Sequence, residues 1–594
     1  MGTPMATAGF DTAVRVPAAE APSPEGPRRR TRALLHVAWI GALALAAGLR
    51  VGRFGFHPSD QGFILAQSWR VLHGEIPHTD IISARPLGSA VLHVLDFAIP
   101  APLFVSSSVL SMVEIIMGTV ALAVLVTRKP LLTWGPGLTG LVAAAALLNL
   151  NSFPLMAWHT IDGIALTALG AWALDSGLRS GNPLARRAGL VLFGLAPLVK
   201  QSFAPAALVG LAWLALHPST RRPVRWPRIL VDLCCLGACG AGYVGVVALD
   251  GGFTTMADQL TGGLPAYAER LLTFWDGASI RFVWPVLAVV IVMAGIALVR
   301  RRGDRFRALH GVFLLVGAAV VVRVVVRGGF SAELRWADIL WWAAVAAVLL
   351  AGVLAHRPPW PALLVPALGL MISLSWGQDT PTLLAGSLAL TVAVVLADGL
   401  PAVPWRRQER LVAAGALGLA AVVAASVLVV KKHDEGAYLD VSHDRLTEDL
   451  GTVTPAMAGV RTNPGTYAYL AQIEDCVRRF PAADVAVLAN NPFAYPAFGL
   501  HNPFPLEWPL PLEVVADAPQ RMLDTAAGLN ARGDYLVLFQ TVDPDVLAKG
   551  GPVPATVSAD APIIDYLGVE NGIRDALHGT PVTCGSFVGR WAPR

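Results

Sequence analysis

Residues 103–127 read LFVSSSVLSMVEIIMGTVALAVLVT, an apolar run in which Glu114 is the one charged side chain. A bilayer core about 30 Å thick needs about 20 apolar residues in a helix, because every backbone amide must be satisfied within its own segment. A carboxylate at that depth is costly and is expected to face other helices rather than lipid. The stretch therefore predicts a membrane-spanning helix inside a bundle, with Glu114 as a helix-packing group or part of a polar site.

Further apolar runs of the same kind lie on both sides of this one. In chain order the predicted spans are 33–54, 103–127, 131–150, 160–178, 188–200, 203–217, 229–249, 281–299, 308–326, 338–355, 360–375, 380–397 and 411–430. The runs 188–200 and 203–217 are short, so they form either two half-length helices or one broken helix. The sequence thus predicts a mainly α, polytopic transmembrane helix bundle of about eleven to thirteen helices.

The composition excludes several classes of protein. Of 594 residues, 55% are hydrophobic and 14% are charged, with a mean hydropathy of +0.57. Soluble domains carry about 25% charged residues, so a soluble multidomain enzyme is excluded. The basic residues are scattered without interleaved aromatic residues, which excludes a nucleic-acid partner. Because the sequence has no Walker-type loop, HExxH, CxxC or GxSxG motif, it gives no support for ATP hydrolysis, zinc protease or serine esterase chemistry.

Charge divides the chain into two parts, because residues 1–430 have a balance of +12 and residues 431–594 one of −8. With a cytoplasmic amino terminus, 23 of the 33 basic residues before position 430 fall in cytoplasmic segments. We therefore predict a disordered cytoplasmic segment at 1–32, the bundle at 33–430 with a first outer loop at 55–100, and an extracytoplasmic domain at 431–594. The Ala- and Arg-rich, Lys-poor usage favours a bacterial plasma membrane.

The extracytoplasmic part has the pattern of an α/β domain. Short β-rich runs at 484–488 and 534–539 each follow a predicted helix, at 466–480 and 518–531. A loop rich in proline and aromatic residues covers 490–509, and it is either a packed structural loop or part of an acceptor-binding site.

Two of the five cysteines, Cys476 and Cys584, lie in this outer domain, where the environment is oxidising. They are a disulfide candidate, although spacing alone does not establish proximity. The other three, Cys234, Cys235 and Cys239, share one apolar run and are expected to behave as small hydrophobic residues.

The first outer loop carries the residues best suited to chemistry. Asp60 follows the first predicted span, and Gly62 opens an amphipathic stretch at 63–72 that is expected to lie along the membrane interface. A turn beginning at Pro77 then presents His78 and Asp80. A carboxylate placed there could act as a general base towards an acceptor hydroxyl, whereas the alternative for both carboxylates is helix capping and solvated loop polarity.

This loop resembles the first periplasmic loop of the GT-C glycosyltransferases, polytopic enzymes that take a sugar from a polyprenyl phosphate at the outer leaflet. The resemblance lies in three short motifs, which are Asp60-Gln61-Gly62, then Gly74-x-x-Pro77-x-x-Asp80, then Pro86-x-Gly88. It implies that Asp60 is the catalytic aspartate and Asp80 the second carboxylate, and that transfer inverts the anomeric configuration. Gln61 stands where a second acidic residue is common and His78 where an aromatic residue is common, and both are assigned to the substrate site.

Cations near the outer ends of the spans are candidates to bind the lipid phosphate. Lys200 is one of only five lysines, and Lys200-Gln201 resembles a Lys-Gln pair of the same family. Arg85 belongs to the first loop, whereas Arg323 and Arg327 are four residues apart and share a helix face. Phosphate leaving groups need such cations. The alternatives are snorkelling to the interface for Lys200 and lipid contacts or salt bridges for the arginines.

The resemblance implies a glycosyltransferase that moves arabinose or mannose from a polyprenyl-phosphate donor to an extracytoplasmic glycan or lipid acceptor, in contact with membrane lipids. A divalent metal, Mg²⁺ or Ca²⁺, is a further expectation, although Gln61 removes one of the carboxylates that hard cations prefer. Two rival classes are a transporter or flippase of lipid-linked glycans and a non-catalytic scaffold for envelope assembly. A transporter would be expected to have repeated halves with broken helices, and no clear internal repeat is present.

Overall fold

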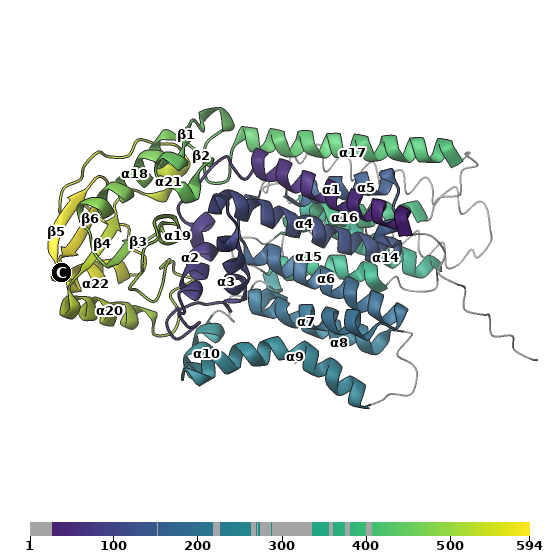
Figure 1. The fold of residues 1–594 in the computed structure, drawn as a ribbon, viewed down its shortest axis with the longest axis horizontal. Coiled ribbons are helices and arrows are strands. Elements are labelled where there is room, and N and C mark those ends of the chain that lie inside the picture. Colours follow the sequence, from purple (N-terminus) through teal and green to yellow (C-terminus); the bar gives the residue numbers. More distant parts are fainter. Residues whose placement is uncertain are drawn as a thin grey trace, which may run out of the picture.

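The computed structural model describes residues 26–150, 153–217, 226–262, 269, 271–273, 287, 336–355, 360–374, 380–398 and 407–594. Its fold is a helical bundle followed by a carboxyl-terminal α/β domain, which confirms the predicted fold class. The long helices run alongside one another, and the α/β domain covers one end of the bundle (Figure 1). The short helices α2 (Asp60–Leu72) and α3 (Gly88–Leu92) lie between the two parts.

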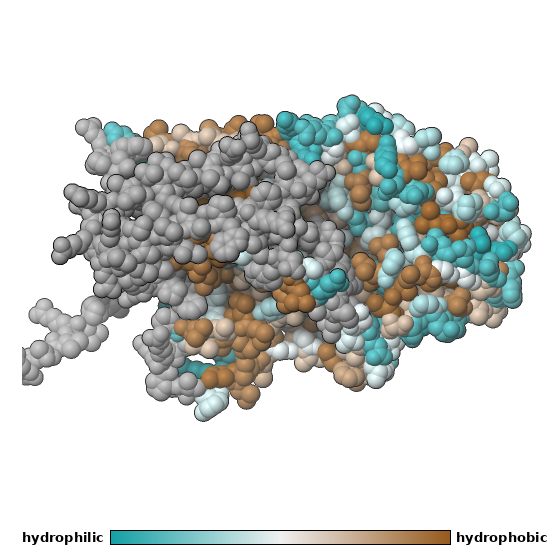
Figure 2. All heavy atoms as spheres, turned by 180° about the vertical axis from the view of Figure 1, so that it is seen from behind, coloured by the Kyte–Doolittle hydropathy of each residue, from teal (hydrophilic) through white to brown (hydrophobic). Residues whose placement is uncertain are grey.

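The bundle is built from apolar helices close to the predicted spans. They are α1 (Gly26–Arg50), α4 (Leu103–Thr127), α5 (Pro136–Leu150), α6 (His159–Ser180), α7 (Pro183–Val199), α8 (Ala204–Leu216), α9 (Trp226–Leu249), α14 (Trp336–Ala355), α15 (Leu364–Ser373), α16 (Ala385–Asp398) and α17 (Arg407–Glu435). In the described part of the chain, four helical segments are long and apolar enough to cross a membrane, at Arg29–Arg50, Leu103–Thr127, Trp226–Leu249 and Gln408–Glu435. Brown, apolar side chains cover much of the described bundle surface, whereas the α/β domain shows more polar, teal side chains (Figure 2).

The predicted and observed helices differ in a few places. The runs 188–200 and 203–217 are two helices, α7 and α8, with the backbone break at Lys200. The helix α1 begins at Gly26, within the segment predicted to be disordered. The predicted spans 281–299 and 308–326 lie outside the described residues, apart from position 287.

Local sequence explains the tight turn between α6 and α7. Gly181 ends α6 with a φ of 72°, a left-handed conformation that glycine adopts without steric cost. The Asn182 side chain then accepts hydrogen bonds from the first amides of α7, and Pro183 occupies the first helical turn. A Cβ at Gly189 would lie 2.4 Å from the backbone nitrogen of Leu174, so these two helices pack at backbone contact. This close packing fixes the position of α7 relative to α6.

The carboxyl-terminal α/β domain, which keeps the name outer domain from its predicted location, contains a four-stranded sheet with the order β3-β4-β6-β5. The strands β3 (Asp484–Leu488) and β4 (Tyr535–Gln540) are parallel, and β6 (Phe587–Ala592) pairs antiparallel with both β4 and β5 (Thr580–Cys584). Alternate residues of β4 pack on opposite faces of the sheet, one against α18 (Pro464–Arg479) and the other against α20 (Ala518–Arg532). The remaining elements are α10 (Phe253–Gly262), β1 (Glu448–Asp449), β2 (Arg461–Thr462), α19 (Ala494–Phe498), α21 (Pro544–Ala548) and α22 (Val569–Ala576).

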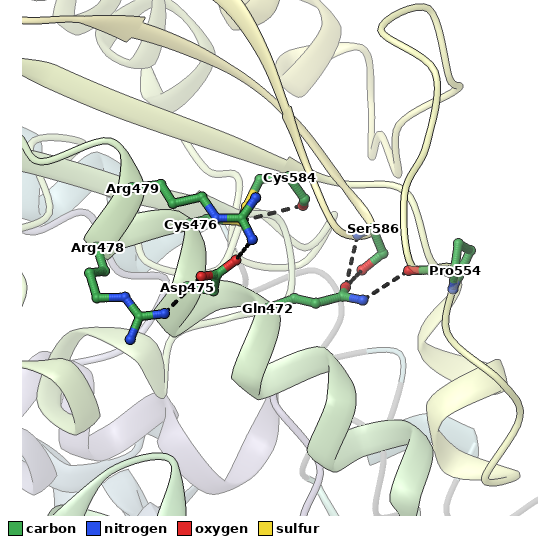
Figure 3. Close-up of a disulfide and its surroundings, with 8 residues drawn as sticks. All are labelled: Gln472, Asp475, Cys476, Arg478, Arg479, Pro554, Cys584 and Ser586. Atoms are coloured by element: carbon green, nitrogen blue, oxygen red, sulfur yellow. Dashed lines mark hydrogen bonds and ion pairs between the residues drawn. A yellow bond between two sulfur atoms is a disulfide. The ribbon is translucent and has the colours of Figure 1, made fainter.

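A disulfide joins Cys476 of α18 to Cys584 of β5, the pair that the sequence offered as a candidate (Figure 3). Next to it, Gln472 accepts hydrogen bonds from both the backbone N–H and the hydroxyl of Ser586. The bond closes a loop of 108 residues and ties the edge strand of the sheet to a helix on its face. Cys234, Cys235 and Cys239 are free thiols on the apolar helix α9.

The helix α2 is covered by the outer domain, and its position at a membrane interface stays a prediction. Most of its side chains are buried. A Cβ at Gly62 would lie 2.2 Å from the Cα of Phe493, and the Phe63 ring packs edge-on to Trp508 with centroids 5.3 Å apart. The loop at 490–509 therefore packs against α2, as its structural interpretation predicted.

Candidate functional site

Asp60 opens α2 at the junction of the bundle and the outer domain. Its Oδ2 accepts a hydrogen bond of 2.7 Å from the hydroxyl of Tyr438, a residue just after α17. Burial raises the pKa of Asp60, while the Tyr438 hydrogen bond and the charge of Arg85 lower it, and the net pKa lies above the ordinary value. The carboxyl group is thus buried and oriented, with a pKa moved towards the range useful for a base.

The turn before α2 fixes the direction of Asp60. Gln61 Oε1 accepts a hydrogen bond of 2.6 Å from the backbone N–H of His57, and its Nε2 donates to the carbonyl of Gly55. Gly55 has a φ of +89°, which favours glycine. The Phe56 N–H donates to Asp440 of the outer domain. Gln61 therefore holds the turn in shape, and its amide is engaged by the backbone.

Arg85 links the first outer loop to the outer domain. Its guanidinium forms an ion pair of 2.6 Å with Glu513 and lies 5.8 Å from the centre of the Phe63 ring. The same guanidinium is close enough to interact electrostatically with Asp60 and Lys200. Arg85 is therefore near both the carboxyl group of Asp60 and the ammonium group of Lys200.

Lys200 is buried at the end of α7, with only 2% of its surface exposed. Its ammonium donates a hydrogen bond of 3.0 Å to the hydroxyl of Thr160 in the first turn of α6. The next residue, Gln201, donates from its side chain to the carbonyl of Ala84 in the first outer loop. Next to Thr160, the buried Nδ1 of His159 has no hydrogen-bond partner in the described part of the chain. The break between α7 and α8 thus places Lys200 beside the loop that carries Arg85.

An apolar cavity of about 470 Å³ lies next to this cationic group. Its walls come from α9, α7 and the first outer loop, and they include Leu198, Val199, Tyr243 and Val246. Val199 directly precedes Lys200 in the chain. Of the described residues that line this cavity, Glu75 is the one with a charged side chain.

His78 and Asp80 lie in a separate turn of the same loop. His78 adopts a φ of 65° and is buried between Gln259 of α10 and Tyr243 of α9, each 2.8 Å from a ring nitrogen. Burial lowers the pKa of His78, opposed by the Gln259 hydrogen bond, so the imidazole is neutral at pH 7. The exposed Asp80 accepts a hydrogen bond from the backbone N–H of Ile76 in its own turn.

Asp60 and Lys200 therefore each interact electrostatically with Arg85, and Gln61 and Gln201 hold the surrounding backbone. Arg323 and Arg327 lie outside the described residues. Sequence reasoning missed Tyr438 and Glu513, which reach the site from the outer part of the chain. The one available signal for Glu513 was its place shortly after the proline- and aromatic-rich loop.

A second pair of charges ties the two parts of the chain together. Arg70 of α2 donates to Glu507 at 2.7 Å and to Glu75 at 2.6 Å, and its guanidinium also donates to the carbonyl of Phe504. Arg70 and Glu507 are both buried. Like Arg85 and Glu513, this pair joins the first outer loop to the segment after 500.

The described residues contain one group of three metal-ligating side chains that could share an ion, namely His93, Glu114 and Asp162. Asp60 is not a member of that group. The carboxyl group of Asp60 is bonded to Tyr438, and its neighbour is an amide, so the donor set around Asp60 does not fit Mg²⁺ or Ca²⁺, which prefer several carboxylate oxygens.

No family model matches the sequence, and no curated protein matches it. Among solved structures, it is similar to the oligosaccharyltransferase of Archaeoglobus fulgidus in its apo form, at 12% identity and a TM-score of 0.42, over 85% of this chain and 69% of that one. The same protein, AglB, in complex with an inhibitory peptide and a dolichol-phosphate matches at 12% identity and 0.42, over 86% and 70%.

The complex of the Archaeoglobus protein with Zn and sulfate matches at 13% identity and a TM-score of 0.40, over 85% of this chain and 68% of that one. At these identities and TM-scores the likeness carries no argument about chemistry. Function therefore has to be argued from the side chains of this chain.

Proposed function

We propose that this protein is a membrane glycosyltransferase of the GT-C type, which moves a sugar from a polyprenyl-phosphate donor to an extracytoplasmic glycan or lipid acceptor. The observation that carries the proposal is the position of Arg85, whose guanidinium interacts electrostatically both with the buried carboxyl group of Asp60 and with Lys200 at the junction of the bundle and the outer domain. An apolar cavity beside Lys200 offers room for the first part of a lipid tail.

In the proposed reaction Asp60 accepts the proton of the acceptor hydroxyl, whose oxygen attacks the anomeric carbon of the donor. The bond between that carbon and the phosphate oxygen breaks, and the lipid phosphate leaves as an anion. Lys200 and Arg85 stabilise the charge that develops on the phosphate. Attack from the face opposite the leaving group inverts the anomeric configuration.

The other predicted residues have supporting parts in this proposal. Asp80 serves as the second carboxylate from its exposed turn, and Gln61, His78 and Gln201 shape the walls of the site. Arg323 and Arg327 supply further positive charge towards the phosphate. The site lies on the extracytoplasmic side of a bacterial plasma membrane, the amino terminus is cytoplasmic, and arabinose or mannose is the sugar transferred.

Transfer by the purified full-length protein tests this proposal. The protein in detergent is mixed with a polyprenyl-phosphate arabinose or mannose and a short glycan acceptor, and the elongated glycan is measured by mass spectrometry. A Lys200→Met variant is expected to bind donor at least tenfold more weakly, because it loses the cation and keeps the length of the chain. The matched control is Lys431→Met, which removes an exposed lysine of α17.

Two results would contradict the proposal. The first is the absence of product with either donor while the protein moves intact donor across a vesicle membrane, which is the behaviour of a flippase. The second is an unchanged donor affinity in the Lys200→Met protein.

A further inference from the structure

A buried polar cluster lies where three elements of the bundle meet. His93 comes from the short helix η1 (His93–Ala98) in the first outer loop, Glu114 from α4 and Asp162 from the first turn of α6. One ligand atom from each of the three lies within 4.8 Å of the others. Asp60, Arg85 and Lys200, which carry the proposed transfer, are not members of this cluster.

The imidazole of His93 is oriented in the manner of a metal ligand. Its Nδ1 pairs with the carboxylate of Asp96 at 3.0 Å, which leaves Nε2 facing Asp162 at 3.2 Å. Histidine ligands of metal ions commonly donate the second ring N–H to a carboxylate, which fixes the ring and makes the free nitrogen a better donor to the metal. The side chains of His93, Asp96 and Asp162 are all at least 97% buried.

The two carboxylates of the cluster complete a ligand set. Ser89 donates its hydroxyl hydrogen to Oδ2 of Asp162, which leaves Oδ1 directed towards His93. Oε2 of Glu114 is buried and has no hydrogen-bond partner among the described residues, while the carboxyl group as a whole lies within hydrogen-bonding reach of Asp162. A buried, unpartnered carboxylate oxygen beside other carboxylates is costly, and an ion would satisfy it.

The net charge of the cluster also indicates a bound cation. Asp96, Glu114 and Asp162 surround a single imidazole, so the four groups together would carry two net negative charges even with His93 protonated. A buried excess of that size is neutralised either by protons or by a cation. A divalent ion takes the place of the proton on the His93 nitrogen and lowers the excess to one negative charge, while it uses that nitrogen and both free oxygens.

We propose that His93, Glu114 and Asp162 bind a first-row divalent ion such as Zn²⁺ or Mn²⁺, which fastens the first outer loop to α4 and α6. One imidazole nitrogen with two carboxylate oxygens suits these ions better than Ca²⁺ or Mg²⁺, which take oxygen ligands. The ion has a structural effect on the proposed site, because Asp162 lies in the same turn as Thr160, the hydrogen-bond acceptor of Lys200.

Metal content tests the proposal without any need for turnover. Full-length protein without a histidine tag is purified in detergent, stripped with EDTA, incubated with ZnCl₂ or MnCl₂, desalted and measured by mass spectrometry of the metal. The wild type is expected to retain about one ion per chain and to unfold at a higher temperature with the ion than without it. CaCl₂ and MgCl₂ are expected to produce neither effect.

Variants locate the ion. Glu114→Gln keeps the shape of the side chain and is expected to lose retention, as is His93→Gln. Asp96→Asn, which removes the negative charge beside the imidazole and keeps the size of the side chain, is expected to weaken binding by about tenfold to a hundredfold. The control is His73→Gln, at an exposed histidine of the same loop.

Failure of the wild type to retain Zn²⁺ or Mn²⁺ would overturn the proposal and leave protons as the neutralising charge. Retention by Glu114→Gln and His93→Gln equal to that of the control would overturn it as well. Either result is independent of whether the protein transfers a sugar, so the metal site and the proposed transferase activity fail separately.

Discussion

Removal of the hydroxyl of Tyr438 is expected to change the pH at which Asp60 works. In the wild type this hydroxyl donates to the carboxylate at 2.7 Å and stabilises its charged form, in opposition to the effect of burial. A hydrogen bond to a charged group is worth about 1.5–3 kcal/mol, and one pKa unit corresponds to about 1.4 kcal/mol. The Tyr438→Phe variant should therefore raise the pKa of Asp60 by about one to two units.

The sign of the effect on activity follows directly. Transfer needs the carboxylate form of Asp60, so a higher pKa moves the acid limb of the activity profile to higher pH, by the same one to two units. The assay is the rate of sugar transfer at saturating donor across the pH range, and the plateau at high pH should change less than the acid limb. The control is Tyr467→Phe, because that tyrosine is only partly buried and its hydroxyl, among the described residues, bonds only to Thr452. An acid limb that coincides with the wild type in a folded Tyr438→Phe protein would refute the reasoning.

Three further predictions concern stability, each measured by thermal or denaturant unfolding of the full chain. Cys584→Ser opens the 108-residue loop and should destabilise the outer domain by up to about 4.7 kcal/mol in the chain-entropy model, so an unchanged midpoint would contradict the bond. Glu507→Gln weakens a buried ion pair with Arg70 and should lower the free energy of unfolding by about 3–5 kcal/mol. A decrease below about 1 kcal/mol, which is typical of a surface ion pair, would contradict this prediction. Gly62→Ala places a methyl group against the outer-domain backbone and should lower the free energy of unfolding by about 1–3 kcal/mol. The control is Gly41→Ala, whose methyl group would have no neighbouring atom within 4 Å and should not destabilise the protein.

The membrane helices were predictable because hydropathy is a local property. The helix α4 covers the residues that its apolar run predicted, and α7 and α8 are the two short helices that the sequence left as one of two alternatives. In the outer domain β3 covers 484–488 as predicted, since a short β-rich run bounded by turn residues is also a local signal. In these elements the local preference and the tertiary structure agree.

The helix α2 shows which contacts local reasoning misses. Its pattern of apolar and polar residues is typical of an interfacial helix, yet its polar face carries Arg70, which pairs with Glu507. That partner lies more than 400 residues further along the chain, and no periodicity records such a pairing. The same applies to Tyr438 and Glu513, whose side chains reach Asp60 and Arg85 only after the outer domain has docked.

Lys200 was recognisable for a different reason. A lysine at the end of an apolar run is energetically unfavourable, and residues of this kind are often functional. The sequence alone therefore indicates a role for Lys200. What the sequence could not give was its contact with Thr160 and its proximity to Arg85, because both depend on how α6 packs against α7.

The most direct test of the central claim is a paired measurement on one preparation of Asp60→Asn protein. Its turnover with a polyprenyl-phosphate sugar and its affinity for that donor are compared with those of the wild type at the same pH. Loss of a general base should lower turnover by about 10²–10⁴-fold, while donor affinity, which depends on Lys200 and Arg85, stays within about threefold. Near-wild-type turnover in a folded Asp60→Asn protein would contradict the account.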